Sequence, residues 1–490
     1  MWLSEHAKVN FTSTQSAHQL LLTSIIVYIG ITLVIGLLTS RFIKSSNDFV
    51  LAGRKLPLAL ASTALFATWF GSETVLGASS EFVEHGLIGV VEDPFGAALC
   101  LLLVGLLVAR PLYKRNILTF CDFYRDRFGK RTEILSSLCM VPSYFGWIAA
   151  QLVALGIIFN VVAGISTTSG IIIGAVVVLI YTYIGGMWAI SITDFLQSII
   201  IIAGLIFLAL DLFDAAGGLE VVVSRAPDDF FRFLPEPKLD ASVEYFAAWI
   251  TIGLGSIAQQ DVFQRVMAAK SARVAVRASY IGAFMYLTIG FIPLMIGLAA
   301  IQVYPEVLDT VSDAQLVLPT VVLEHADIWI QVMFFGALLS AIMSTTSGAI
   351  LAPATILAEN LIRPYLSDQS DANLLRYLRI SVVLIAVAAT IMANIQSNIY
   401  DLVAQSSALS LVSLFVPLMA GLYWKRATEL GAILSIVAGM MVWIFFEISE
   451  ADIPSLLPGL MASIIGMITG NLIIQSQKDE KKSPENVRRS

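Results

Sequence analysis

Residues 334–358 read FFGALLSAIMSTTSGAILAPATILA, a run long enough to cross a bilayer as one helix. Leu, Ile, Phe and Ala dominate it, but hydroxyl side chains cluster at its centre. Ala341, Ser344 and Thr345 are spaced i, i+3 and i+4, which places them on one helical face. Adjacent hydroxyls and nearby backbone carbonyls can replace the hydration shell of a small hard cation where little water is present. The alternative is that these small residues only allow close packing between membrane helices.

The composition is that of a membrane protein. Of all residues, 57% are hydrophobic and 13% are charged, and the mean hydropathy is +0.83, well above the range of soluble globular chains. Apolar runs of about 20 residues recur along most of the sequence. We therefore expect an all-α polytopic membrane protein. Its environment would be the lipid bilayer of the plasma membrane, or of the inner membrane if the source is bacterial.

Thirteen membrane spans are predicted. They cover residues 20–41, 58–83, 93–113, 134–163, 170–187, 191–213, 244–264, 276–303, 327–357, 378–398, 401–422, 429–447 and 455–475. With the N-terminus outside, 25 of the 29 Lys and Arg residues fall on the inner side, as the positive-inside rule requires. The predicted topology therefore places the N-terminus outside and the C-terminus inside.

Two predicted spans contain glycines at matching positions. The second span contains Gly71 and Gly77, and the seventh contains Gly253 and Gly255. Because four spans separate them, five-span units that start at each would have opposite membrane orientations. Interrupted helices in two inverted halves are typical of secondary transporters with a binding site near the membrane midplane. Tight helix packing is the alternative reason for these glycines.

This reading divides the chain into seven parts. They are an extracytoplasmic N-terminus at 1–19, an additional first helix at 20–41, a first five-helix repeat at 58–213, an extracytoplasmic loop at 214–243, a second five-helix repeat at 244–422, two peripheral helices at 429–475 and a charged cytoplasmic tail at 476–490.

Four stretches resemble motifs of the sodium:solute symporter family. They are YTYIGGMWA at 181–189, TDFLQ at 193–197, QRVMAAKSARVAVRAS at 264–279 and AIMSTTSGAILAPATILAEN at 341–360. The resemblance covers about residues 45–425 and implies a LeuT-type core of inverted five-helix repeats with discontinuous helices. It also implies a sodium ion as the coupling cofactor.

The resemblance implies specific ion ligands. The usual sodium site of the family corresponds here to the carbonyls of Ala67, Phe70 and Ala341 and the hydroxyls of Ser344 and Thr345. A second site, seen in some members, would use Asp194 and Ser347. However, Gly348 stands where those members have a serine, so one coupled sodium ion is favoured over two.

Asp194 also stands out without the family. A carboxylate in an apolar span costs about 2.5–3.5 kcal/mol on insertion scales, so it usually faces a partner or a water path. The alternative is a position near the cytoplasmic interface, where the cost is small.

Within the family, the chain is most similar to the choline-transporter-like branch. Residues 67–71, ATWFG, and 145–156, FGWIAAQLVALG, carry this resemblance. It implies an aromatic contribution from Trp69 and Trp147, and we expect the solute site to lie beside Trp69, Glu73, Asp93, Trp147 and Gln259. Aromatic rings attract a quaternary ammonium by about 0.5–2 kcal/mol per contact.

The solute site departs from that branch at two positions. The branch has a tryptophan in place of Gln259 and a small residue in place of Asp93, so a complete aromatic cage is not established. Asp93 either pairs with a substrate ammonium or lies at the outer interface. Trp69 and Trp147 are cage members, interfacial residues or packing residues.

The sequence favours a transporter over other classes. The four histidines fall near outer ends or loops, and no catalytic motif or phosphate-binding loop is present, so we do not expect an enzyme. No ATP-binding subunit or nucleic acid partner is expected either. We predict sodium-coupled import of a small organic solute, choline or another amine, or else an amino acid, a carboxylate or a sugar. A symporter-like sensor with a separate signalling partner and a channel are the alternatives of other classes.

Overall fold

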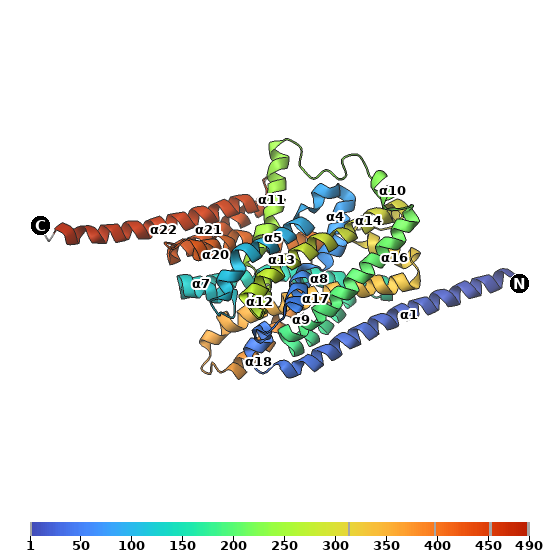
Figure 1. The fold of residues 1–490 in the computed structure, drawn as a ribbon, viewed down its shortest axis with the longest axis horizontal. Helices are drawn as coiled ribbons and strands as arrows, with labels where there is room; N and C mark the ends of the chain where they lie inside the picture. Colours follow the sequence, from blue (N-terminus) through green and yellow to red (C-terminus); the bar gives the residue numbers. More distant parts are fainter. Residues whose placement is uncertain (1, 312–313, 396–397, 450–452, 488–490) are drawn as a thin grey trace.

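The structure is a computed structural model that describes residues 2–311, 314–395, 398–449 and 453–487. The described residues form helices and their connections, apart from one isolated bridge between Leu56 and Ala269. The N-terminal helix and the C-terminal helix point away from the helical body in opposite directions (Figure 1). The body itself contains the interrupted helices on which the candidate sites are built.

The helices of the first half are α1 (Trp2–Thr39), η1 (Ser40–Phe42), α2 (Ser46–Leu51), η2 (Ala52–Arg54), α3 (Leu58–Trp69), η3 (Glu73–Gly77), α4 (Ala78–His85), η4 (Gly86–Val90), η5 (Val91–Gly96), α5 (Ala97–Leu103), η6 (Val104–Val108), α6 (Ala109–Tyr113), α7 (Phe120–Phe128), α8 (Lys130–Ala163), α9 (Thr167–Ala216) and α10 (Leu219–Ser224).

The helices of the second half are α11 (Leu239–Gly255), η7 (Ser256–Ala258), α12 (Gln260–Ala268), α13 (Ala272–Ile289), α14 (Phe291–Val303), α15 (Val307–Thr310), η8 (Ala314–Leu316), α16 (Val317–His325), α17 (Ile328–Ile356), η9 (Leu357–Ile362), η10 (Arg363–Tyr365), α18 (Asp371–Ala393), α19 (Ile399–Ser410), η11 (Leu411–Phe415), α20 (Val416–Tyr423), α21 (Glu429–Ile448) and α22 (Leu456–Val487).

Eleven helical runs in the described ranges are long and apolar enough to cross a membrane. Two of these runs extend over residues of more than one predicted span. The run Glu73–Tyr113 contains the end of the second predicted span and all of the third, and α9 contains the fifth and sixth. A polytopic helical protein is therefore confirmed, whereas the count of thirteen and the positions of the termini stay predictions.

The long helix α9 is broken at Gly186. Fifty residues in one helix would measure about 75 Å, far more than the roughly 30 Å of hydrocarbon that a span crosses. Gly186 has φ 47° and ψ −153°, a conformation that side chains disfavour. A Cβ there would also lie 2.6 Å from the carbonyl oxygen of Phe49. Glycine at this position therefore permits both the break and the close approach of α2.

Both predicted helix interruptions are present. α3 ends at Trp69 and helical structure resumes at Glu73, with Phe70 between them at φ −75° and ψ 77°. α11 ends at Gly255, and after one 3₁₀ turn Gln259 is extended at φ −92° and ψ 144° before α12 begins. These breaks free backbone groups from helical hydrogen bonding in the protein interior, where other partners must satisfy them.

Candidate functional site

The first break lies against the hydroxyl-bearing face of α17. The Ser344 and Thr345 hydroxyl oxygens lie 3.1 Å and 3.3 Å from the carbonyl oxygen of Ala67. All three residues are fully buried. Three of the five residues that sequence analysis assigned to the ion therefore meet near the end of α3. Phe70 lies at the break itself, and Ala341 is buried one turn before Ser344.

Asp194 of α9 joins this group. Its Oδ1 lies 2.5 Å from the Ser344 hydroxyl oxygen, and it is fully buried. Asp194 therefore lies in the protein interior, in contact with α17. Ser347, by contrast, donates its hydroxyl hydrogen to the Ser344 carbonyl at 2.9 Å, within its own helix.

This group of side chains has more hydrogen-bond acceptors than hydrogen atoms to donate. The Ser344 hydroxyl has one hydrogen but lies within reach of two acceptors, the Ala67 carbonyl and Asp194. The other carboxylate oxygen of Asp194 is buried and has no hydrogen-bond partner among the described residues. A small cation at this point would satisfy the excess oxygen atoms, and hard cations prefer such ligands. The residues present therefore fit a sodium ion.

A buried arginine contacts both helices that carry these ligands, about one turn before Ala67 on α3 and one turn after Ser344 on α17. Arg265 of α12 is fully buried, and its Nε donates to the Ala64 carbonyl at 3.2 Å. Its Nη2 has no hydrogen-bond partner in the described part of the chain. A Cβ at Gly348 would lie 2.1 Å from that nitrogen. The guanidinium therefore occupies the space that a serine side chain at position 348 would need.

Arg265 acts on two buried carboxylates. Its positive charge attracts both Asp194 and Asp261 electrostatically. Asp261 accepts a hydrogen bond from Trp69 Nε1 at 2.9 Å and another from the Tyr144 hydroxyl. A network of charged groups therefore connects the ion ligands to an aromatic side chain of the candidate solute site.

A cavity lies on the other side of the first break. Its lining consists of Trp69, Glu73, Asp93, Ala97, Trp147, Ile252, Ser256, Gln259, Tyr286, Val403, Ser406 and Ser407. All five residues predicted for the solute site are among them. About 320 Å³ is free of protein atoms, but the centre of a water molecule can occupy only about 20 Å³ of it. The cavity is narrow in this conformation, so a solute can enter only if side chains or helices move.

Both tryptophans are oriented by carboxylates. Trp147 Nε1 donates to Glu73 Oε1 at 2.9 Å, as Trp69 Nε1 does to Asp261. Trp69 is 5% exposed and Trp147 is 3% exposed, so neither is an interfacial residue. The second oxygen of Glu73 accepts a hydrogen bond from Gln151 Nε2 at 2.7 Å.

Asp93 is a buried cavity residue. It is only 1% exposed, so its side chain is enclosed by protein. Its Oδ2 accepts a hydrogen bond from Thr74 at 2.7 Å and lies 3.3 Å from the Tyr286 hydroxyl. Its Oδ1 is buried and has no partner among the described residues. One carboxylate oxygen of Asp93 is therefore available to a ligand.

Gly71 separates the ion ligands from the cavity. A Cβ added there would lie 2.7 Å from the Thr345 hydroxyl oxygen and 2.6 Å from both Gln151 Oε1 and Glu73 Oε2. Gln151 Oε1 also accepts a hydrogen bond from the backbone nitrogen of Ser72 at 3.0 Å. The backbone at Gly71 is thus in close contact with both candidate sites.

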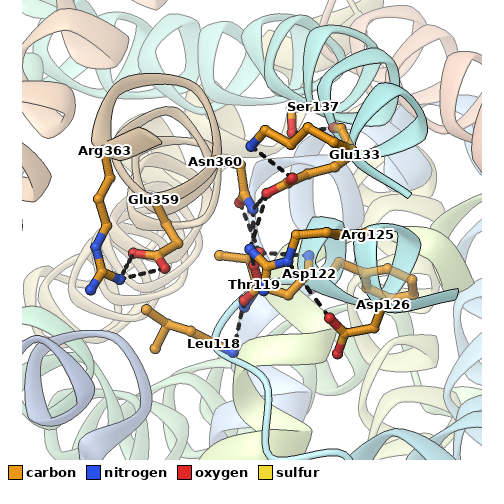
Figure 2. Close-up of polar contacts among 12 residues, drawn as sticks. Leu118, Thr119, Asp122, Arg125, Asp126, Glu133, Ser137, Glu359, Asn360 and Arg363 are labelled. Atoms are coloured by element: carbon orange, nitrogen blue, oxygen red, sulfur yellow. Dashed lines mark hydrogen bonds and ion pairs between the residues drawn. The ribbon is translucent and has the colours of Figure 1, made fainter. Parts of the chain in front are cut away.

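A second polar cluster lies where α7 meets α8 and η9 (Figure 2). We call Thr119, Asp122, Arg125, Glu133 and Asn360 the α7 cluster. α7 begins at this point because Thr119 and Asp122 form a capping box. Asn360 Nδ2 donates to Asp122 Oδ1 at 3.0 Å and to Glu133 Oε1 at 2.8 Å.

Ion pairs complete the α7 cluster. Arg125 Nη1 lies 3.1 Å from Asp122 and 3.3 Å from Glu133. Burial lowers the pKa of Arg125, but the surrounding carboxylates, Asp122 and Glu133 foremost, outweigh that effect, and the pKa of Arg125 is raised above its ordinary value. The cluster therefore joins α7 and α8 through ion pairs, and joins both to η9 through the Asn360 amide.

Sequence analysis missed several residues of these sites. Asp261 and Arg265 lie at the end of the second interrupted span, and a buried charge in an apolar segment was a usable signal for both. Tyr286 and Gln151 carried no such signal, because tyrosine and glutamine are common in packed helices. The structure alone places Tyr286 at the cavity and Gln151 in contact with Glu73.

Comparisons with known proteins bear on the family and the fold of this chain. The model of the sodium:solute symporter family matches residues 49–439. High-affinity choline transporter 1 of Drosophila melanogaster is 27% identical over 423 residues, which cover 82% of this chain and 67% of that protein. The high-affinity proline transporter PutP of Bacillus subtilis is 27% identical over 463 residues, or 91% and 96% of the two chains.

Solved structures have the same fold. The structure of a Na⁺-coupled sialic acid symporter in a substrate-bound outward-open state matches with a TM-score of 0.80 at 19% identity, and the match covers 92% of this chain and 98% of that one. The predicted LeuT-type architecture is therefore confirmed. Its division into residue ranges stays a prediction.

Proposed function

Because the chain belongs to the sodium:solute symporter family, we propose that it uses a sodium gradient to import a small organic cation, choline or another amine. The observation that carries this proposal is the pair of carboxyl side chains in the cavity lining. Glu73 and Asp93 line it, and no basic side chain does among the described residues. A cation would neutralise these carboxylates, and the indole rings of Trp69 and Trp147 offer it further attraction.

The choice of solute also draws on the relatives. Choline transporters and proline transporters match this chain at similar identity. A zwitterionic amino acid such as proline is therefore the second candidate, because its ammonium group could pair with Asp93. Its carboxylate would face repulsion from Glu73, which a simple amine avoids. Carboxylates and sugars gain no support from the charge of the cavity.

Coupling would arise at the first helix break. A sodium ion bound by the Ala67 carbonyl, Ser344 and Thr345 would hold the end of α3 against α17. The same segment carries Trp69 and leads into Glu73, so closure around the ion would also assemble the solute site. Ion and solute would then favour the same conformation, and each would raise the affinity of the other by the same factor.

The charges around the ion favour a single sodium. Asp194 and Asp261 carry two negative charges when ionised, and Arg265 supplies one positive charge. One sodium ion would complete the balance, since buried charges are normally compensated. We propose that the guanidinium of Arg265 takes the place of a second ion. The membrane potential would then contribute about 2.3 kcal/mol per imported charge at 100 mV.

Uptake by purified protein in proteoliposomes tests this function. Radiolabelled choline should accumulate above its external concentration when sodium is present outside, and should not accumulate in potassium. Labelled proline in parallel vesicles decides between the two solute candidates. Equilibration without accumulation would indicate a channel. Solute binding without transport would indicate a sensor, and either result would overturn the proposal.

A further inference from the structure

Three arginines converge on a pocket at the end of two helical runs, outside the cavity described above. Gly105, Leu106 and Arg110 line one side of it, and Arg273, Val276, Arg277 and Tyr280 of α13 line the other. The centre of a water molecule can occupy about 270 Å³ of this pocket, against about 20 Å³ of the cavity. The pocket therefore has room for a bound molecular group.

The charge of this pocket is positive and uncompensated. Arg110, Arg273 and Arg277 are exposed, and no acidic residue lines the pocket. None of the three forms an ion pair in the described part of the chain, whereas Arg125 and Lys130 nearby in sequence pair with carboxylates. Arg273 and Arg277 are four residues apart on one helix, so both side chains lie on the same face.

The chemistry of arginine indicates the kind of anion. The guanidinium group is planar and binds phosphate oxygens through two parallel hydrogen bonds. Three such groups around one pocket suit a phosphate group better than a single carboxylate, because phosphate offers more acceptor oxygens.

The position of the pocket indicates where that phosphate comes from. Arg110 lies close to the end of the apolar run Glu73–Tyr113, and the other two arginines lie at the start of the run Ala272–Val303. The Lys and Arg distribution predicts that these ends face the cytoplasm. Leu106 is 64% exposed, and Phe284, one turn beyond Tyr280, is 69% exposed. Exposed apolar side chains therefore extend from the arginines along the lipid-facing surface.

We propose that this pocket binds the phosphate headgroup of an anionic phospholipid from the cytoplasmic leaflet. The three arginines hold the phosphate, and the acyl chains lie along Leu106 and Phe284. Basic pockets between membrane helices on the cytoplasmic side are suited to such headgroups. The inference is independent of the transported solute.

Occupation of the pocket would act on the transport core. The Tyr280 ring packs against Gly105, where an added Cβ would lie 2.7 Å from Cε1 of the ring. One turn or less further along α13, an added Cβ at Gly282 would lie 3.3 Å from the Leu65 Cβ of α3. A lipid bridging the two sides of the pocket would thus hold Gly105 and its neighbours against α13, the helix that also contacts α3.

Thermal unfolding of the full chain in detergent with added lipid tests the proposal. We expect phosphatidylglycerol, but not phosphatidylcholine, to raise the unfolding temperature. The triple variant Arg110→Gln, Arg273→Gln, Arg277→Gln should lose this difference. Arg376→Gln is the matched control, because Arg376 is also exposed and is the sixth residue of its helix, as Arg277 is.

Single variants and a parallel measurement with inorganic phosphate complete the test. If the triple variant does not fold, Arg273→Gln and Arg277→Gln are tested separately, and each should reduce the phosphatidylglycerol shift while Arg376→Gln leaves it intact. An unchanged shift in these variants overturns the proposal. An equal shift produced by inorganic phosphate alone also overturns it, since that would indicate a site for a free anion.

Discussion

The Ser344 hydroxyl lies 2.5 Å from Asp194 Oδ1, so a side chain of the ninth predicted span contacts one of the sixth across the helical body. Removing the Ser344 and Thr345 hydroxyls would leave the Ala67 carbonyl and Asp194 without these partners. Interactions with charged groups contribute about 1.5–3 kcal/mol each. We expect Ser344→Ala with Thr345→Ala to raise the sodium concentration for half-maximal uptake roughly 10- to 100-fold.

Thr346→Ala is the control for this double variant. The Thr346 hydroxyl donates to the Ile342 carbonyl within its own helix, so its removal should leave the sodium requirement unchanged. An unaltered sodium requirement in the double variant would exclude Ser344 and Thr345 from the ion site.

Asp93→Asn tests the charge of the solute cavity. The substitution keeps the shape of the side chain but removes its negative charge, so the affinity for a cationic solute should fall roughly 10- to 100-fold. Competition by the uncharged isostere of choline, in which carbon replaces nitrogen, should change little. Glu81→Gln serves as the control, because Glu81 pairs with His85 and does not line the cavity. Equal losses for the charged and neutral ligands would indicate a packing role.

Arg265→Gln tests the proposed stoichiometry. Without the guanidinium, the space beside Asp194 becomes free for a second sodium ion. The Hill coefficient for sodium should rise from about one toward two, and the charge moved per solute, measured from reversal potentials, should increase by one. Arg265→Lys keeps the positive charge and should preserve the original values. If unaltered protein already moves two sodium ions per solute, Arg265 does not replace one.

Asn360→Leu tests the hypothesis that the α7 cluster holds the inner side of the helical body closed. The substitution removes the amide that connects Asp122 and Glu133 to η9. Opening of this end should become easier, and the fully buried Cys121 of α7 should react faster with a maleimide, by about tenfold for a loss of 1–2 kcal/mol. The assay uses a background with Cys100→Ser and Cys139→Ser.

Asn373→Leu is the control for that assay. The Asn373 amide contacts Asp368, an exposed residue close in sequence, so the reaction of Cys121 should keep its rate. If Asn360→Leu has the same rate as this control, the α7 cluster does not limit opening.

The sequence predicted the parts of the fold that depend on local pattern. Apolar runs predicted the membrane helices, and Gly71 and Gly253 marked interruptions that the structure contains at residues 70–72 and 256–259. The number of spans was harder to define, because helices such as α9 continue across a break with only one glycine out of helical geometry. Boundaries of this kind depend on tertiary packing rather than on composition.

The candidate sites were predictable only where a resemblance or a costly residue marked them. Asp194 was recognisable because a carboxylate rarely enters an apolar span without a reason, and Asp93 because it departs from the branch that the chain resembles. The position of Arg265 beside Gly348 was not, since it requires knowing that two segments more than 80 residues apart in sequence touch. Side chains such as Tyr286 acquire their importance only from the three-dimensional arrangement.

Gly71 has no side chain. A Cβ added there would lie within 2.7 Å of side-chain oxygen atoms of Thr345, Gln151 and Glu73. A single stretch of backbone therefore separates the proposed ion ligands from the cavity. A displacement on one side of this backbone is transmitted to the other side. A rearrangement that admits a larger solute should therefore also move the backbone next to Thr345. With sodium bound at Ser344 and Thr345 as proposed, a redesign of the solute specificity should also alter the dependence on sodium, even when no ion ligand is replaced.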